Sequence, residues 1–394
     1  MSEAPYKDLV VIELARVLAG PWIGQILADL GATVIKVESP EGDDTRHWGP
    51  PFLRDRDGQK ADAAYFHSCN RGKRSIVADL KTENGRKLVR DLVAGADVLI
   101  ENFKVGGLSQ YGLDYATLSA RHPKLVYCSV SGFGQDGPYA QRPGYDFLSQ
   151  AMSGIMDLTG DADGAPQKMG VAFADIFTGL YGLIGVQAAL AQRDRSGRGQ
   201  LIDVSLLDSM VGVLANQAMN FLVTGTPPRR MGNVHPNICP YQTFATADEL
   251  VVIAVGNHDQ FVKLCDVLGQ TEIGSDARYA SNELRVANRE VLCDALQSAF
   301  LEWPRARLLD ALADVGVPAA PINSLAEVFE DPQVQHRALQ LLMPSSWAEN
   351  GSIPGIRTPI IFSDSDMDCS RSSPRLDEHR ESILAELYGT KVDK

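Results

Sequence analysis

The sequence is poor in cysteine, and its cysteines are not paired. Only six occur among 394 residues, and no two of them stand in a C-x-x-C arrangement. This scatter argues against a zinc site or a disulfide framework and is typical of free thiols in a reducing compartment. The first residues also lack a basic segment followed by an apolar one, so we expect no signal peptide and a cytoplasmic location.

Positive charge and long apolar runs are scarce as well. Lys and Arg number 37 against 50 Asp and Glu, which gives a net charge of -13. This charge argues against a nucleic-acid partner, although it leaves room for a local cationic pocket that binds a small phosphorylated ligand. Because no uninterrupted apolar run is long enough to cross a bilayer, we expect no membrane partner. A hydrophobic content of 44% and a charged content of 22% indicate a globular protein, and its length suggests two domains.

Strand-like and helix-like segments alternate through the first half of the chain. β-Branched runs at 9–14 and 33–38 flank a helical pattern at 22–30, which predicts a Rossmann-like βαβ unit. The unit lacks G-x-G-x-x-G, so the sequence does not support a nicotinamide or flavin cofactor. Residues 39–71 are expected to form a loop. Further strands are expected at 75–79, 97–103, 125–130 and 201–204, and helices at 82–93, 115–120, 145–159, 175–191 and 205–222.

A Gly- and Pro-rich segment at 225–230 predicts a domain boundary. Beyond it, the pattern predicts a smaller α+β domain, with strands at 241–245 and 250–255 and helices at 259–268, 282–301 and 304–315. A short helix near 325–329 and a strand near 353–362 follow. We therefore divide the chain into residues 1–224, 225–325 and 326–394.

A single acid, Asp175, stands among apolar and small residues in the segment 170–182. Phe177, Leu180 and Tyr181 follow it with helical spacing, which places it at or near a helix N-terminus, where free amides and the dipole favour an anion. The simpler interpretation of this segment is that Asp175 is an N-cap. The alternative is a shielded carboxylate that acts as a nucleophile on an acyl group.

Polar side chains also follow several of the predicted strands. In open α/β sheets, ligands bind beyond the carboxyl ends of the strands, so residues 16–20, Lys81 and Asn102 with Phe103 are expected around one crevice. Asn102 could also be an ordinary turn residue at the end of a strand.

Six segments occur in the order 16–21, 31–38, 73–76, 96–103, 170–182 and 197–200. Together they resemble the class III CoA-transferase family, also called the CaiB/BaiF type. The resemblance covers nearly the whole chain. It implies a Rossmann-like large domain formed by both chain ends, a smaller inserted α+β domain, and an interlocked homodimer.

The resemblance also implies the chemistry. Asp175 matches the family nucleophile, which passes through an aspartyl anhydride and an aspartyl-CoA thioester, with helix-end amides stabilising the oxyanion. CoA and acyl-CoA are then substrates, and neither a permanently bound cofactor nor a metal is expected. The CoA-binding positions that carry over are Arg16, Val17, Leu18, Ala19, Ala78, Lys81, Asn102, Phe103, Lys104, Arg142 and Tyr145.

Residues 42–51, and His235 followed by residues 240–242, resemble the branch of the family that uses succinyl-CoA to activate dicarboxylates such as glutarate or itaconate. A dicarboxylate needs a cation for its distal carboxylate, which arginine can bind in a bidentate manner. Arg46, Arg71 and Arg142 are the candidates for this cation, and His235 is a further candidate for a substrate contact.

Two other functions remain open. The same fold hosts α-methylacyl-CoA racemases, which use an aspartate and a histidine; here Tyr145 stands at the histidine position, and tyrosine is a poor base at neutral pH. The chain could also be a CoA-binding paralogue without turnover, although the intact Asp175 argues against this.

Overall fold

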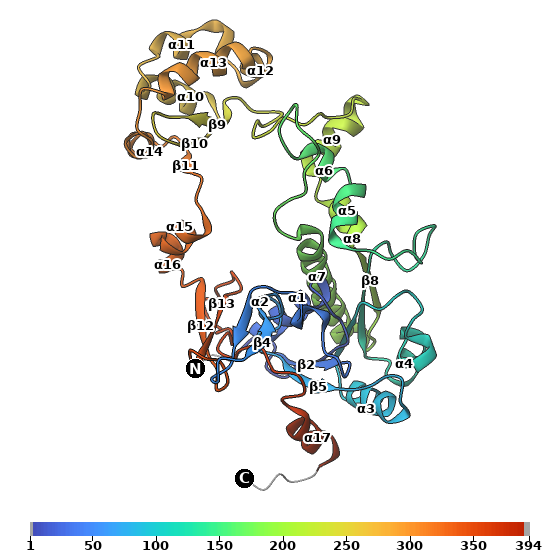
Figure 1. Ribbon diagram of the computed structural model, residues 1–394. Helices are drawn as coiled ribbons and strands as arrows, with labels where there is room; N and C mark the ends of the chain where they lie inside the picture. The colour runs from blue at the N-terminus through green and yellow to red at the C-terminus, as the bar shows by residue number, and fades with distance from the viewer. Residues whose placement is uncertain (1–2, 390–394) are drawn as a thin grey trace. The chain divides into compact units, whose positions relative to one another are not determined.

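The computed structural model describes residues 3–389 and forms two compact units (Figure 1). Within these residues, unit 1 comprises 3–155, 168–223 and 332–389, and unit 2 comprises 156–167 and 224–331. Residues 156–167 therefore belong to the smaller unit and not, as expected, to the large one. The second boundary lies at 331/332 and not at 325/326.

Unit 1 is built on a six-stranded sheet in the order β5-β2-β1-β6-β7-β8, and every neighbouring pair is parallel. This confirms the predicted α/β class with a parallel central sheet. The strand order changes direction between β1 and β6, which is the switch point where such sheets bind ligands. The strands are β1 (Val10–Glu13), β2 (Thr33–Glu38), β5 (Arg74–Val77), β6 (Val98–Glu101), β7 (Val126–Ser131) and β8 (Leu201–Ser205).

Helices cover both faces of this sheet. Successive residues of a strand point to opposite faces, so each strand contributes side chains to both helix layers. Val11 packs with α1 (Ala19–Asp29) and α7 (Phe173–Ser196). The next residue, Ile12, belongs to the core formed with α3 (Glu83–Ala94) and α4 (Tyr115–Arg121). The hydroxyl of Thr82 accepts a hydrogen bond from the amide of Gly85, so Thr82 is the N-cap of α3.

Helix α7 is the longest helix among the described residues, with 24 residues. By length and composition alone it could cross a bilayer, contrary to the expectation from the sequence. Its buried face packs on α1 at two glycines. A Cβ on Gly179 would lie 2.9 Å from the carbonyl oxygen of Ala19, and one on Gly182 would lie 2.5 Å from Cδ1 of Ile23. One face of α7 therefore belongs to the core of unit 1, whereas Leu180, Tyr181 and Ile184 are exposed.

Several elements of the first 224 residues differ from the predictions. The predicted loop at 39–71 contains η1 (Asp44–Arg46), β3 (Phe52–Arg54), β4 (Lys60–Ala63) and α2 (Ala64–His67). The two long helices predicted at 145–159 and 205–222 are each interrupted. They form α5 (Asp146–Met152) and α6 (Ile155–Leu158), and α8 (Leu206–Gly212) and α9 (Ala215–Thr224).

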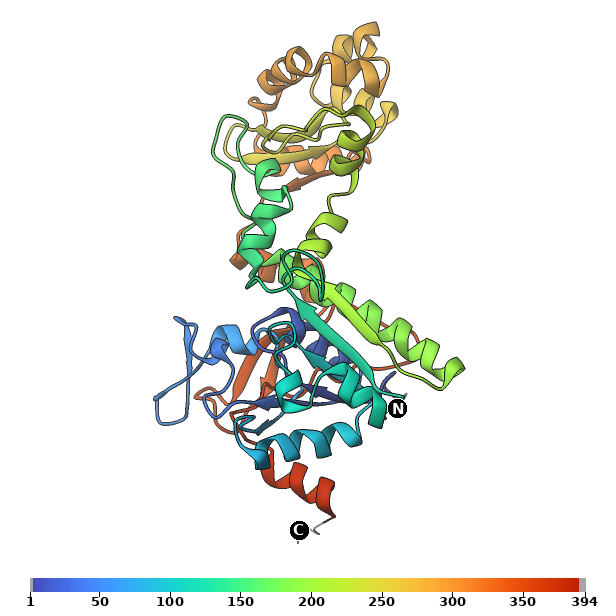
Figure 2. The same cartoon turned by 90° about the vertical axis from the view of Figure 1, so that its right-hand side faces the viewer.

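The last part of the chain returns to unit 1. It contributes α16 (Pro332–His336), the antiparallel pair β12 (Gln340–Pro344) and β13 (Ser352–Ile356), and α17 (Arg380–Tyr388). Both views show α17 beside α3 (Figure 1, Figure 2), where the Tyr388 hydroxyl donates to the Asp91 carboxylate at 2.7 Å. Beside the sheet, the Asp377 carboxylate accepts from the amide of Val77 at 2.6 Å. The tail therefore covers the β5 edge.

Unit 2 has its own core, which contains Phe244, Phe261 and Phe300. Its three-stranded antiparallel sheet has the order β11-β10-β9. The strands are β9 (Tyr241–Ala245), β10 (Leu250–Ala254) and β11 (Ala319–Pro321), and the helices are α10 (His258–Val267), α11 (Thr271–Ser275), α12 (Asn282–Ala287), α13 (Arg289–Phe300), α14 (Arg305–Asp314) and α15 (Leu325–Glu330).

Candidate active site

Asp175 is the third residue of α7, which confirms its predicted place at the start of a helix. The N-cap is Ala172, which makes no side-chain cap, so the simpler interpretation of Asp175 as the N-cap is wrong. The side chain is half-buried. Among residues 3–389 its carboxylate accepts no hydrogen bond. Burial, together with the nearby negative charge of Asp146, raises the pKa of Asp175 to about 7.

Asp146, the first residue of α5, supports this site, although sequence reasoning did not select it. Its carboxylate accepts from the amide of Ala174 at 2.8 Å and from the side-chain amide of Gln150 at 2.7 Å. Gln150 in turn accepts from the amide of Met169 at 2.9 Å. The sequence signal that could have identified Asp146 is an acid at the start of a predicted helix. Because Asp146 occupies the Ala174 amide, this N–H is not free to stabilise an oxyanion.

Asp175 lines a pocket of about 500 Å³ at the carboxyl ends of β1, β6 and β7. The pocket therefore lies at the switch point of the sheet, where the strand order predicts ligand binding. Nine of the eleven CoA-binding positions expected from the resemblance line this pocket together with Asp175: Arg16, Val17, Leu18, Ala19, Asn102, Phe103, Lys104, Arg142 and Tyr145.

The remaining two positions, Ala78 and Lys81, line a second pocket of about 240 Å³. Arg16 and Phe103 belong to both pockets, so the two adjoin. The structure thus brings all eleven positions together along one path, which runs from the end of β5 to the start of α7.

Cationic side chains line this path, although the protein as a whole is acidic. Lys81, Lys104 and Arg142 are exposed, and Arg16 pairs with Asp44 at 2.9 Å. The Arg142 guanidinium lies over the Tyr139 ring, 3.9 Å from its centre. Glu38, Glu41, Asp43 and Asp79 also line the second pocket, but the exposed cations give charged partners to an elongated anion that has an electrophilic group near Asp175.

Residues 6–380 match the family described as CoA-transferase family III. The chain belongs to this family. It is 56% identical over 385 residues to a succinate–glutarate CoA-transferase from Agrobacterium fabrum, covering 97% of this chain and 96% of the relative. It is 41% identical over 387 residues to a succinyl-CoA:glutarate CoA-transferase from Mus musculus, covering 98% of this chain and 87% of the relative.

A solved structure supports the same assignment. The crystal structure of a CAIB/BAIF family protein from Brucella suis is 58% identical, with a TM-score of 0.86, and covers 98% of this chain and 100% of its own. The predicted family is therefore confirmed by sequence and by fold.

Two of the arginines expected to contact substrate occupy structural positions in this family III chain. The Arg46 guanidinium pairs with Glu38 at 2.7 Å and Asp62 at 2.6 Å, and Arg71 pairs with Asp29 at 2.5 Å. Both arginines are buried, and neither lines the two pockets. We therefore correct the hypothesis for both, because their donors are occupied by ion pairs inside unit 1.

His235 lies in unit 2, where its ring packs on Tyr241 with 5.0 Å between the ring centres. Burial, with a smaller effect of Arg289, lowers the pKa of His235. Its role in substrate binding stays a prediction.

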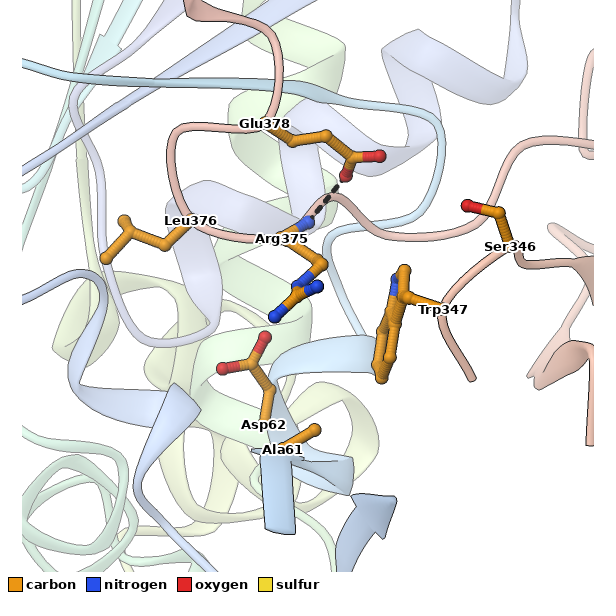
Figure 3. Close-up of a pocket in the computed structure, with 7 residues that line it drawn as sticks. All are labelled: Ala61, Asp62, Ser346, Trp347, Arg375, Leu376 and Glu378. Atoms are coloured by element: carbon orange, nitrogen blue, oxygen red, sulfur yellow. Dashed lines mark hydrogen bonds between the residues drawn. The ribbon is translucent and has the colours of Figure 1, made fainter. Parts of the chain in front are cut away.

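A third pocket of about 540 Å³ lies elsewhere in unit 1 (Figure 3). In Figure 3 the Arg375 guanidinium faces the Asp62 carboxylate and lies beside Trp347. None of the predicted site residues lines this pocket.

Within residues 3–389, no group of three or more His, Cys, Asp and Glu side chains is arranged to hold a metal. The Asp175 pocket is therefore the candidate active site of this CoA-transferase family member.

Proposed function

We propose that this protein transfers CoA from succinyl-CoA to a dicarboxylic acid such as glutarate or itaconate, with Asp175 as the nucleophile. The observation that carries the proposal is a shielded carboxylate without hydrogen bonds among the described residues, in a pocket lined by the expected CoA positions. The names of two relatives support the choice of succinate and glutarate.

The first half of the reaction releases the donor acid. A carboxylate oxygen of Asp175 attacks the thioester carbonyl of succinyl-CoA, and the C–S bond breaks to release CoA thiolate and leave a mixed anhydride. The thiolate then attacks the aspartyl carbonyl carbon. Cleavage of the C–O bond releases succinate and leaves an aspartyl-CoA thioester.

The second half loads the acceptor. The acceptor carboxylate attacks the aspartyl thioester, expels CoA thiolate and forms a second mixed anhydride. The thiolate attacks the acceptor carbonyl, which gives the new CoA thioester and restores the Asp175 carboxylate. No net proton or electron is exchanged, so the residues only need to shield, orient and neutralise charge.

The surroundings of Asp175 suit these steps. A raised pKa makes the ionised carboxylate more basic and hence a stronger nucleophile. Phe173 and Phe177 flank it on α7 and stack on each other at 5.6 Å, which helps to exclude water from the anhydride. Lys81 and Lys104 are available to neutralise CoA phosphates. Arg142 is available for the distal carboxylate, since no acid among the described residues pairs with it.

We further propose an interlocked homodimer in the cytoplasm. Besides the family resemblance, its support is a set of large apolar side chains that one subunit leaves exposed on α5, α7 and α9, including Phe147, Ile184 and Leu222. Sedimentation equilibrium of the purified protein would contradict the homodimer if it gave the mass of a single chain at micromolar concentration.

Mass spectrometry of the CoA products tests the proposed activity. With succinyl-CoA as donor, glutarate and itaconate should accept CoA, whereas Asp175→Asn should lose most transfer and Asp175→Ala all of it. Hydroxylamine added during turnover should convert Asp175 to a hydroxamate. A label found on another residue, or activity only with formate–oxalate or carnitine pairs, would contradict the proposal. Exchange of the α-proton in D₂O would instead favour the racemase alternative.

The role of Arg142 is tested separately. Arg142→Gln should raise KM for a dicarboxylate acceptor much more than KM for a monocarboxylate, because only the former has a distal carboxylate to pair. Arg121→Gln, an exposed arginine of α4, is the matched control. An equal effect of Arg142→Gln on both acceptors would remove Arg142 from the specificity site.

A further inference from the structure

Val17 has an unusual backbone conformation inside the Asp175 pocket. Its φ is 71°, in the left-handed region that β-branched residues strongly disfavour. The residue lies between β1 and α1 and lines the same pocket as Asp175. A conformation of this kind persists only where the surrounding structure holds it.

Both backbone polar groups of Val17 are held by side chains. The amide donates to the two carboxylate oxygens of Asp43, each at 3.3 Å. The carbonyl accepts from the thiol of Cys69 at 3.4 Å. The preceding residue, Arg16, is held in the same way by Asn102, whose side chain accepts from its amide at 2.9 Å and donates to its carbonyl at 2.7 Å.

Asp43 is itself fixed by buried partners. Its carboxylate accepts from the amide and the hydroxyl of Thr45 at 3.0 and 2.8 Å and pairs with the Lys36 ammonium at 2.9 Å. Lys36 also donates to the carbonyl of Ala15 at 2.9 Å and pairs with Glu13 at 3.1 Å. Lys36 and Asp43 are each 1% exposed. Lys36 thus connects Ala15, the residue just before the loop at 16–18, to Asp43, which holds the amide of Val17.

Burial opposes the charge on Asp43, but Lys36 and Thr45 outweigh it and lower the pKa of Asp43 to about 2. Attraction to Asp43 and Glu13 likewise outweighs burial and raises the pKa of Lys36. Both groups of the pair are therefore ionised at neutral pH.

We infer that the buried Lys36–Asp43 pair is a positioning device, which holds Val17 in its strained conformation so that residues 16–18 keep their place beside Asp175. The inference rests on the proposed function for its effect on turnover. Lys36 and Asp43 also line the second pocket, but each is 1% exposed, so we assign neither a contact with substrate; both act through residues 16–18.

Asp43→Asn is the first test, since it preserves shape but removes the charge. The loss of a charge-assisted hydrogen bond predicts a fall of about tenfold to a hundredfold in kcat/KM for the acyl-CoA donor. We expect the KM for the donor to rise more than the KM for the acceptor. Unchanged kinetics in Asp43→Asn would overturn the inference.

A rescue experiment separates positioning from a general loss of structure. Glycine adopts φ near 71° without strain, so Val17→Gly should restore kcat/KM of Asp43→Asn by about tenfold. Val17→Ala is the matched control, because it shortens the side chain but keeps the Cβ that causes the strain. Equal rescue by both substitutions, or rescue by neither, would refute the role of strain.

Stability provides a measurement that needs no substrate. In an otherwise unchanged chain, Val17→Gly should unfold at a higher temperature than Val17→Ala, since alanine at positive φ is disfavoured. Equal unfolding temperatures would overturn the inference even where Asp43→Asn fails to fold. This comparison is independent of the proposed function, whose failure would appear instead in the Asp175 labelling experiment.

Discussion

The raised pKa of Asp175 predicts that the proposed nucleophile destabilises the folded protein at neutral pH. The pKa rises from 3.8 to about 7, and each pKa unit corresponds to about 1.4 kcal/mol. Ionising Asp175 in the folded protein therefore costs about 4 kcal/mol more than ionising it in the unfolded chain. The perturbation that removes this cost is Asp175→Asn, which has nearly the same shape and no charge.

The sign follows from proton binding. Between pH 3.8 and about 7, folded Asp175 keeps a proton that the unfolded chain has released, so the free energy of unfolding falls as pH rises through this window. The asparagine side chain of the variant has no proton to lose. The stability of Asp175→Asn relative to wild type should therefore grow by up to about 4 kcal/mol between about pH 4 and pH 8.

Urea unfolding at a series of pH values between about 4 and 8 measures this difference. Asp194→Asn, which changes an exposed acid on the same helix, is the matched control and should show no comparable gain. In parallel, kcat/KM of the wild type should fall about tenfold per pH unit below about pH 7, because the attacking carboxylate must be ionised. A stability difference between Asp175→Asn and wild type that stays constant with pH would refute the reasoning.

Three further predictions concern packing and anchoring. Gly179→Ala places a Cβ 3.0 Å from Cβ of Trp22 and should destabilise by about 1–3 kcal/mol, seen as a lower urea midpoint; an unchanged midpoint would show that α1 and α7 can move apart. Arg71→Met leaves Asp29 buried without its ion pair and should lose about 3–5 kcal/mol in the same assay, whereas a loss below about 1 kcal/mol would contradict a structural role. Asn102→Ala removes both hydrogen bonds to the backbone of Arg16 and should raise KM for acyl-CoA about tenfold in steady-state kinetics. An unchanged KM would mean that residues 16–18 keep their conformation without Asn102.

Much of unit 1 was predictable because its signals are local. The β-branched runs that became β1 and β2 are buried on both faces, which is the pattern of a central parallel strand. The hydroxyl at Thr82 and the apolar spacing after Asp175 mark two helix starts within a few residues of sequence. The ordered motifs then identified the family and the positions along the pocket.

What the sequence could not show depends on which side chains of different elements pair in the fold. Arg46 and Arg71 stand in a polar stretch that resembles a surface loop, but their acids Glu38 and Asp29 lie on other elements. Charge alone does not distinguish an arginine that binds substrate from one in a buried ion pair. The strain at Val17 was equally invisible, because a β-branched residue at positive φ contradicts local preference.

The tail that covers β5 has a consequence for how the chain is made. The residues that cap this strand, Asp377 and its neighbours, follow unit 2 in the chain. While a ribosome is still producing unit 2, the outermost strand of the sheet presents unpaired backbone groups, which invite pairing with another nascent chain. Synthesis of unit 2 thus sets the length of time during which the half-made protein needs protection from aggregation.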